Sequence, residues 1–316
     1  MAYQNTNFMP KHGDGSVLHL GVKTGQVASR IVSVGSLNRA KLLAQLLDNA
    51  KYETFESSRG FTTFTGTLKG VQISVIATGM GVPNMDFVVR ETKAIIDGPM
   101  AIIRVRDQVT PGSVVVSGKG SVMVTRNPDA FFSDVSGEDC YKVSRVMPAS
   151  SALSKTLVSA MESQLDELRN EPIVAANTDH ELIGVYDGLN ATSCSFYSSQ
   201  GAVQPIIACY FSSSERTAKR TMTVFAGRLD SAFDDRNEQL VENLTKTHPE
   251  LHTLEMETFH LLDLAQRSRG SIQATAAVLV VANRITGQVV ESDLLKALES
   301  FWGGVILETL ASTQLQ

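Results

Sequence analysis

Short apolar runs alternate along the chain with longer stretches in which apolar residues recur at helical spacing. The short runs are typical of buried strands, and the longer stretches are typical of amphipathic helices. We expect strands at residues 31–34, 71–77, 101–105, 113–117, 173–176 and 276–282. We expect helices at residues 37–50, 151–169, 254–267 and 292–311, and a further helix that begins at Pro83. This alternation predicts an α/β fold in which helices flank a central mixed, twisted sheet.

The first expected strand ends in a glycine turn that leads directly into a helix, at Gly35-Ser36-Leu37-Asn38-Arg39. Glycine lets a ligand approach the backbone, a helix start offers free N–H groups, and Arg39 adds positive charge. The segment is therefore a candidate phosphate site, although it lacks the GxGxxG pattern of dinucleotide-binding turns. The alternative is a tight turn followed by a surface arginine, because single-glycine turns are common.

A second glycine turn, at residues 78–81, lies between an expected strand and the helix that begins at Pro83. Ligands of α/β sheets bind at the carboxyl ends of strands, so this turn is well placed, although a plain connection would have the same composition. Arg104 lies inside an apolar run, where an arginine is costly unless it is paired or binds an anion. The sequence leaves open whether Arg104 is functional or part of a structural ion pair.

Three further candidates are less specific on their own. Glu255 and Glu257 flank Met256 at the start of an apolar helix. A carboxylate there can accept two hydrogen bonds from a pair of sugar hydroxyls, although the helix dipole alone also favours acids at this position. Taken alone, Arg59 is better explained as an exposed residue before an edge strand, and His19 as a structural or solvated histidine.

The composition narrows the class of protein. Hydrophobic residues make up 43% and charged residues 19% of the 316 residues, which is an ordinary globular mixture. The net charge is −5 without a basic tract, so we expect no nucleic acid partner. No apolar run approaches the ~18 residues of a membrane span, and the polar N-terminus lacks a signal core, so we expect a cytoplasmic protein without a membrane partner. The three cysteines, Cys140, Cys194 and Cys209, have no CxxC spacing, which favours neither a disulfide framework nor a zinc site.

The order and spacing of the motifs resemble those of the nucleoside phosphorylase-I family, and within it those of the uridine phosphorylases. The motifs span nearly the whole chain: His19-Leu-Gly21, Gly35-Ser-Leu-Asn-Arg39, Ser58-Arg-Gly-Phe-Thr-Thr63, Thr78-Gly-Met-Gly-Val-Pro83, Ile102-Ile-Arg104-Val, Phe196-Tyr-Ser-Ser-Gln200, Glu255-Met-Glu257 and Val281-Ala-Asn283-Arg284. The third and the seventh motif point to the uridine branch rather than to the purine enzymes. The resemblance implies a single-domain nucleoside phosphorylase fold.

The resemblance also implies a phosphate site. Gly35, Arg39 and Arg104 would hold the phosphate, and Arg59 would reach into the phosphate site of a neighbouring subunit. Arg39 and Arg104, together with Glu257, would be the catalytic residues.

The resemblance assigns the ribose to a second group of residues. Glu257 would take the 2′- and 3′-hydroxyls, with Glu255 beside it, and Met256 would pack on the sugar. His19 would donate across the dimer to the 5′-hydroxyl. Shared sites of this kind imply a homodimer or a trimer of dimers.

The implied activity is reversible phosphorolysis of uridine to uracil and ribose 1-phosphate, a step of pyrimidine salvage. Phosphate is the co-substrate, and we expect neither a metal nor an organic cofactor. Positive charge builds on the ribose as the glycosidic bond breaks, and an adjacent phosphate dianion fixed by arginines serves as nucleophile and counter-charge.

The chain departs from the family pattern after Val105. The family normally continues from the strand with a Gly-Thr-x-Gly segment, whose threonine would contact phosphate and ribose. Here Val105 runs directly into Arg106, Asp107 and Gln108, so about six residues are missing relative to that pattern. The implied alternative is a catalytically impaired, nucleoside-binding paralogue. A related purine nucleoside phosphorylase or a nucleosidase is a further alternative.

The second departure interrupts the base-binding motif. Phe196 would stack on uracil and Gln200 would bond its edge, but the arginine of the family's Gln-x-Arg pattern follows only after the stretch 202–227, as Arg228. The end of this stretch, Val-Phe-Ala-Gly, is what a pyrimidine-rich tract and a splice acceptor would encode. We hypothesise that residues 202–227 are a translated intron. We further hypothesise that the gap after Val105 arose because coding sequence was assigned to an intron. Sequencing of the transcript would test both. The alternative is a diverged paralogue with a long loop. The expected organisation is a flexible extension at 1–15 followed by one domain at 16–316, interrupted at 202–227.

Overall fold

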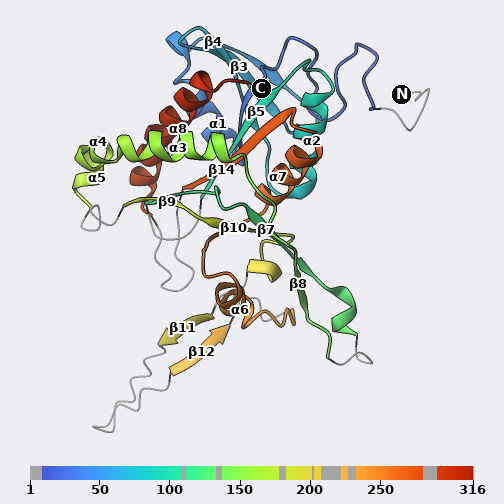
Figure 1. Ribbon diagram of the computed structural model, residues 1–316, viewed down its shortest axis with the longest axis vertical. Coiled ribbons are helices and arrows are strands. Elements are labelled where there is room, and N and C mark those ends of the chain that lie inside the picture. Colours follow the sequence, from blue (N-terminus) through green and yellow to red (C-terminus); the bar gives the residue numbers. More distant parts are fainter. Residues whose placement is uncertain are drawn as a thin grey trace.

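The computed structural model describes residues 9–107, 112–132, 137–177, 183–200, 203–207, 222–226, 233–279 and 290–315. Within these ranges the chain forms two main sheets with helices around the larger one, as Figure 1 shows. The mixed α/β class expected from the sequence is confirmed.

The larger sheet has eight strands in the order β2-β3-β4-β1-β5-β14-β6-β9. Its four central strands β4, β1, β5 and β14 run parallel, and β2 and β3 pair antiparallel to their neighbours. Strand β6 runs antiparallel to β14 but parallel to β9. The strands are β1 (Arg30–Val34), β2 (Tyr52–Glu56), β3 (Thr62–Leu68), β4 (Val71–Ala77), β5 (Met100–Asp107), β6 (Val114–Val116), β9 (Val185–Asp187) and β14 (Ile272–Leu279). Because the central strands are parallel, their carboxyl ends meet at one edge of the sheet.

Helices cover both faces of this sheet (Figure 1). On one face α1 (Leu37–Ala44), α3 (Ser151–Ser163) and α8 (Ser292–Ser312) pack against the sheet, and on the other face α2 (Val82–Lys93) and α7 (Thr258–Arg267) do so. The short helices α4 (Leu165–Asn170) and α5 (Pro172–Ala175) follow α3.

Side chains of the central strands alternate between these two cores. Val32 and Val34 of β1 lie in the core beneath α1, α3 and α8, whereas Ile31 lies in the core beneath α2 and α7. The same period of two places Ile103 in the first core and Ile102 in the second. Even-numbered residues of β5 therefore face α2 and α7, and this face includes position 104.

The smaller sheet has the strand order β13-β10-β7-β8 and packs with α6 around its own apolar cluster. Its strands are β7 (Ser121–Arg126), β8 (Tyr141–Val143), β10 (Leu189–Ser193) and β13 (Leu251–Glu255), and the helix is α6 (Leu240–Thr247). Figure 1 shows this sheet extending away from the helix-covered body. Within the stretch 202–227, β11 (Val203–Ile207) and β12 (Met222–Ala226) pair antiparallel.

The hypothesis that residues 202–227 are a translated intron stays a prediction. The expected extension at residues 1–15 also stays a prediction.

Most expected elements are present, with boundaries that differ. The strands expected at 31–34, 71–77, 101–105 and 113–117 correspond to β1, β4, β5 and β6. The last expected strand corresponds to β14, which ends at Leu279, while residues 280–282 lie outside the described ranges. The helix expected at 37–50 ends earlier, at Ala44, and a 3-10 turn follows at Asp48–Ala50.

Three expectations are wrong in part or in full. Residues 173–176 are not a strand, because Pro172 begins the helix α5 there and Val174 is buried in the core. The helix expected from 254 begins only at Thr258, since the preceding residues pair with β10 as strand β13. The helix expected over 151–169 is divided at Gln164. Strand β2 and the strands of the smaller sheet were not expected from the pattern. Strand β3 was anticipated only as an edge strand after Arg59, whereas it lies between β2 and β4.

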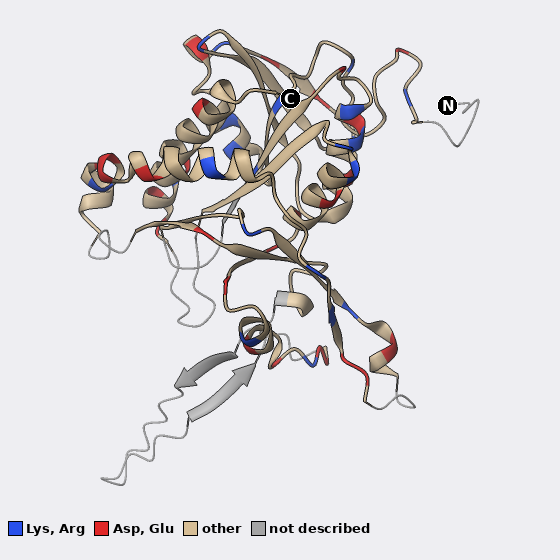
Figure 2. Cartoon of the chain, viewed as in Figure 1, with Lys and Arg blue, Asp and Glu red and all other residues tan. Residues whose placement is uncertain are grey.

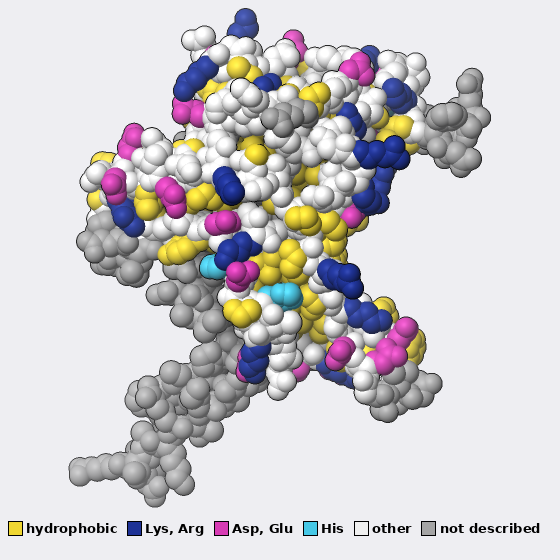
Figure 3. Space-filling model, viewed as in Figure 1, with side chains coloured by type: hydrophobic (Ala, Val, Ile, Leu, Met, Phe, Trp, Pro, Cys, Tyr) yellow, Lys and Arg dark blue, Asp and Glu magenta, His cyan; other side chains and the backbone are white. Residues whose placement is uncertain are grey.

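Charges of both signs are distributed over the helices and strand ends of the molecule (Figure 2). On the face shown in Figure 3, lysine and arginine side chains are most frequent along the right-hand side. Across the described residues, no helix has the length and apolar character needed to cross a lipid bilayer.

Candidate active site

Arg104 lies at the centre of the larger sheet. Its strand β5 pairs with β1 and β14, so Arg104 lies level with Ser33 on one side and Ala276 on the other. The side chain is fully buried. Its NH1 group donates to Ser33 Oγ at 3.0 Å and to Thr78 Oγ1. Hydroxyl groups at the ends of two neighbouring strands thus anchor one side of the guanidinium.

The other side of the guanidinium meets a carboxylate. Arg104 NH2 lies 3.1 Å from Glu257 Oε2, and both side chains are 0% exposed. Glu257 directly precedes α7, and its Oε1 accepts a hydrogen bond from the backbone N–H of Gly81 at the start of α2. The ion pair therefore joins the sheet to the N-termini of both helices on this face. Burial of an ion pair has a high desolvation cost. Buried charged pairs of this kind are frequent at catalytic and binding sites, so Arg104 and Glu257 are candidates for such a site.

Gly35 lies against this pair. A Cβ atom at position 35 would lie 3.3 Å from Arg104 NH2 and 3.6 Å from the carbonyl oxygen of Gly79. The absence of a side chain is therefore what lets the turn after β1 approach the guanidinium so closely. Gly79 has φ +68°, in the left-handed region, which a glycine adopts without strain.

Arg39 is held in an ion pair with α8. It lies in the first turn of α1, where its backbone N–H donates to the helix cap Ser36 Oγ at 3.1 Å. Its NH2 group lies 2.6 Å from Glu299 Oε1, and the two side chains are 10% and 12% exposed. The phosphate contact expected for Arg39 stays a prediction, and phosphate would compete with Glu299 for this cation.

Glu255 is fully buried and holds the start of α7. Its carboxylate accepts from the backbone N–H of Glu257 at 2.7 Å and from that of Thr258 at 2.9 and 3.0 Å. Asn190 Nδ2 donates to it at 2.8 Å, and Thr192 Oγ1 donates as well. These contacts fix the backbone that carries Glu257, and the ribose contact expected for Glu255 stays a prediction.

His19 and Arg59 lie together in a separate part of the fold. The Ser57 hydroxyl donates to the carbonyl oxygen of His19 and accepts from the backbone N–H of Arg59 at 3.1 Å. The Arg59 side chain is exposed, and the His19 ring bonds to Glu91 of α2 at 2.6 Å. No contact between described residues joins either of them to Arg104 or Glu257, which agrees with the expectation that they serve a neighbouring subunit but does not test it.

The base-binding residues are only partly described. Phe196 is half-buried after β10, and its ring meets that of Tyr197 edge-to-face at 5.2 Å. Gln200 lies in the 3-10 turn Ser198–Gln200, Met256 is half-buried, and Arg228 lies outside the described residues.

Several residues at this site were not singled out from the sequence. They are one hydroxyl that holds Arg104, the partner of Arg39, and the residues that hold the His19 loop: Ser33, Glu299, Glu91 and Ser57. Thr78 belongs to a turn that the sequence did single out, but its bond to Arg104 was not expected. A serine inside the apolar run 31–34 was the available signal for Ser33, because a polar residue buried in a central strand needs a partner.

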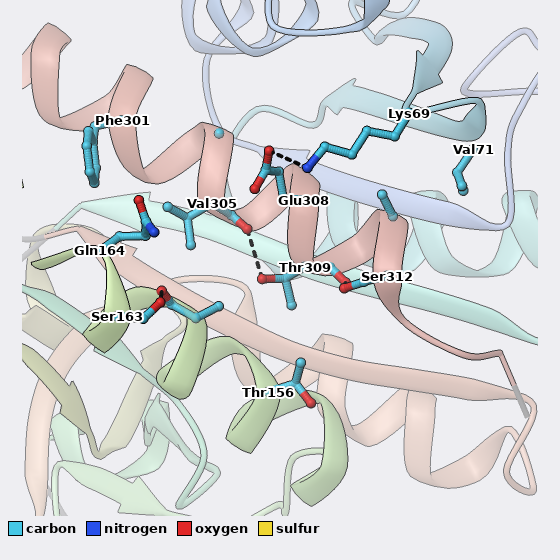
Figure 4. Close-up of a pocket in the computed structure, with 13 residues that line it drawn as sticks. Lys69, Val71, Thr156, Ser163, Gln164, Phe301, Val305, Glu308, Thr309 and Ser312 are labelled. Atoms are coloured by element: carbon cyan, nitrogen blue, oxygen red, sulfur yellow. Dashed lines mark hydrogen bonds and ion pairs between the residues drawn. The ribbon is translucent and has the colours of Figure 1, made fainter. Parts of the chain in front are cut away.

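A groove of about 530 Å³ lies elsewhere, beside α3 and α8 (Figure 4). Lys69 and Glu308 form an ion pair at 2.8 Å across its rim, and the Thr309 hydroxyl donates to the Val305 carbonyl oxygen. None of the expected site residues lines this groove, and we assign it no function.

Comparison with known proteins decides the family of the chain. The sequence profile of the phosphorylase superfamily matches residues 29–301. The chain belongs to this superfamily. The family resemblance inferred from the motifs is thereby confirmed, and nucleoside and phosphate are the substrates that the family implies.

Curated relatives match only part of the chain. DeoD-type purine nucleoside phosphorylases of Geobacillus kaustophilus and Bacillus subtilis are 45% and 43% identical over 75 residues. The matched segment spans 23% of this chain and 31% of each relative.

Solved structures match over nearly the whole length. A uridine phosphorylase of the oomycete Phytophthora capsici is 65% identical, with a TM-score of 0.88, over 99% of this chain and 100% of that one. A Trypanosoma brucei nucleoside phosphorylase with uridine phosphorylase activity is 22% identical, with a TM-score of 0.65, over 97% of this chain and 100% of that one. The second likeness shows the fold alone.

Proposed function

We propose that this protein is a uridine phosphorylase, a pentosyltransferase that converts uridine and phosphate into uracil and ribose 1-phosphate. The full-length likeness to the oomycete uridine phosphorylase supports this proposal. The geometric observation that carries it is the fully buried pair of Arg104 and Glu257 at the carboxyl edge of the parallel strands. The pair brings an anion-binding group and a hydroxyl-binding group into direct contact, as the transfer of a sugar to phosphate requires.

The phosphate site would form around Arg104 and Gly35. Arg104 NH2 faces the Gly35 turn, and the N-terminus of α1 follows that turn. A buried guanidinium beside a helix N-terminus suits a phosphate dianion. Arg39 would turn from Glu299 to the phosphate, and Arg59 would add a further charge from a neighbouring subunit. His19 would reach the 5′-hydroxyl of a nucleoside bound in a neighbouring subunit. This use of His19 and Arg59 requires a homodimer or a trimer of dimers.

The ribose site would form around Glu257. Its carboxylate would accept from the 2′- and 3′-hydroxyls, and Met256 would pack on the sugar. Glu255 would act through position rather than contact, because its oxygens hold the backbone N–H groups at the start of α7. Phe196 would stack on uracil, and Gln200 and Arg228 would bond to its edge.

These groups suit a phosphorolysis. A phosphate oxygen forms a bond to C1′ as the bond from C1′ to the base nitrogen breaks, and the electron pair leaves with uracil, which then takes up a proton. Positive charge on the ribose is stabilised by the phosphate dianion, and negative charge on uracil by amide and guanidinium donors. The co-substrate is inorganic phosphate, and the reaction needs neither a metal nor an organic cofactor.

The test is the release of free base from uridine and from inosine, with and without phosphate. Uracil release that depends on phosphate is the expected result. Release without phosphate would identify a nucleosidase, and release of hypoxanthine alone would identify a purine enzyme. Either outcome would overturn the proposal.

A second candidate function is nucleoside binding without catalysis. Strand β5 continues beyond Val105, with Arg106 and Asp107 paired to Val278 and Leu279 of β14, where the family pattern has its Gly-Thr segment. A chain without the threonine and glycines of that segment would bind nucleoside but transfer it poorly. Uridine binding without cleavage, followed by recovery of cleavage when the segment is inserted after Val105, would support this candidate.

A further inference from the structure

Glu91 is a buried carboxylate that serves one short loop. It lies on α2 and is 2% exposed. Its oxygens accept the backbone N–H of His19 at 3.0 Å and that of Leu20 at 2.8 Å, and His19 Nδ1 lies 2.6 Å from Oε1. An ionised carboxylate can only accept, so His19 Nδ1 must carry the proton in this contact.

The ring of His19 is held in a second direction by Phe87. The two rings stack at a centroid distance of 3.6 Å with an interplanar angle of 6°. Phe87 and Glu91 lie one turn apart on α2, so the same helix face provides both the stacking surface and the carboxylate. The plane of the imidazole and its rotation within that plane are therefore both fixed.

The outer nitrogen of the ring faces away from these contacts. Among the residues that the structure describes, none bonds to His19 Nε2, and the side chain is 19% exposed. In the tautomer that has its single proton on Nδ1, Nε2 carries a lone pair. The arrangement presents an oriented acceptor at the surface, which a hydroxyl group fits because its proton can be donated to that lone pair.

We infer that Glu91 is a positioning residue that sets the preference of this protein for nucleosides with a 5′-hydroxyl, by holding His19 so that Nε2 accepts the proton of that hydroxyl. The inference rests on the proposed function, in which His19 reaches the 5′-hydroxyl of a nucleoside bound in a neighbouring subunit. It reverses the direction that the family resemblance implies, because His19 accepts from the hydroxyl instead of donating to it. A glutamine at position 91 would still accept the loop N–H groups but would bond more weakly to the ring, because only the carboxylate forms a charge-assisted bond.

The decisive comparison is between uridine and 5′-deoxyuridine, with the full-length wild type and Glu91→Gln. A hydrogen bond of this kind corresponds to about a tenfold ratio of kcat/KM between the two substrates in the wild type. Glu91→Gln is expected to lower kcat/KM for uridine about fivefold or more and for 5′-deoxyuridine less than about twofold. A change that only loosened the fold would lower both values equally, and that outcome would overturn the inference.

Two further variants separate position from stability. In the background of His19→Ala, Glu91→Gln should cause no additional decrease in kcat/KM for uridine, because Glu91 acts through the His19 ring, which is absent there. Phe87→Leu removes the stacking but leaves the carboxylate, and should likewise lower uridine turnover alone. It keeps the comparison available if Glu91→Gln fails to fold. A further loss in the double variant would contradict the assignment.

The matched control is Asp86→Asn. Asp86 is also on α2 and also bonds to a histidine, His260 Nε2 at 2.9 Å, so the substitution removes the same charge and the same kind of contact. It should leave the ratio between the two substrates unchanged. A wild type that binds uridine without cleaving it would refute the proposed function, and the ratio of dissociation constants would then test Glu91. Equal turnover or equal binding of the two nucleosides by the wild type would refute the inference itself.

Discussion

Replacement of Glu257 by glutamine removes the negative charge beside Arg104 while it leaves an oxygen for the Gly81 N–H. Removal of one partner of a buried ion pair costs about 3–5 kcal/mol. Because glutamine keeps an acceptor and Arg104 keeps its bond to Ser33, the lower end of this range, about 3 kcal/mol, applies here. The unfolding entropy of a chain of this length is about 0.66 kcal/mol per kelvin, so we expect a decrease in Tm of about 4–5 °C.

Phosphate should reverse most of this loss. A dianion bound at Arg104 supplies the charge that Glu257→Gln removes, so phosphate should bind the variant more tightly than the wild type. At a concentration of about 100 times its Kd, phosphate adds about 2.7 kcal/mol to the free energy of unfolding, or about 4 °C. The assay is thermal unfolding against phosphate at fixed protein concentration, with Kd for phosphate from calorimetry.

Glu250→Gln is the matched control for this experiment. Glu250 pairs with Lys119 at 3.0 Å, but the two side chains are 60% and 40% exposed, so its loss should change Tm by less than about 1 °C. Unfolding of Glu257→Gln at the temperature of the wild type would refute a stabilising role of the buried ion pair. Weaker phosphate binding by the variant than by the wild type would refute the placement of phosphate at Arg104.

Four further substitutions have expected outcomes. Gly303→Ala should lower the free energy of unfolding by about 1–3 kcal/mol, since the new Cβ would lie 2.0 Å from Leu43 Cδ2. Gly304→Ala on the same helix should raise the free energy of unfolding by up to about 1 kcal/mol, because nothing lies within 4 Å of its new Cβ. Denaturant titration checks both variants. Glu255→Gln should raise KM for the nucleoside and lower Tm, because the carboxylate that anchors the start of α7 loses its charge. Steady-state kinetics and thermal unfolding test this, and an unchanged KM with an unchanged Tm would contradict it. Burial raises the pKa of Asp86, but the arginine and the histidine that bond to it lower the pKa by more than burial raises it. The carboxyl therefore has a lowered pKa in the folded protein. Its contribution is therefore present above the unfolded pKa of about 3.9 and is lost as pH falls through the folded pKa. Asp86→Asn should reduce stability near pH 6, and this effect should shrink as the pH falls below about 3.9, which unfolding curves across this range would test.

The apolar pattern predicted the central part of the fold well. The runs that became β1, β4, β5 and β14 are buried on both sides, so their hydrophobicity depends little on which neighbours they have. Local signals also located the helix that begins near Pro83 and the turn at Gly35, because proline and glycine act through their own backbone geometry. Elements whose face is set by distant partners were missed. Residues 251–255 form a strand only because β10 lies beside them, and the run at 173–176 was too short to distinguish a strand from a helix.

The site shows the same division. By itself, the sequence determined that Arg104 must have a partner or an anion, because a guanidinium cannot be buried alone among apolar residues. It also determined the family, because ordered motifs along the chain need no coordinates. Only the tertiary structure decided that the partner is Glu257, that Glu255 holds the backbone instead, and that Glu91 holds His19. The physical reason is that hydrogen bonds and ion pairs act over about 3 Å, and the strand order and helix packing, not the spacing along the chain, decide which side chains come within that distance.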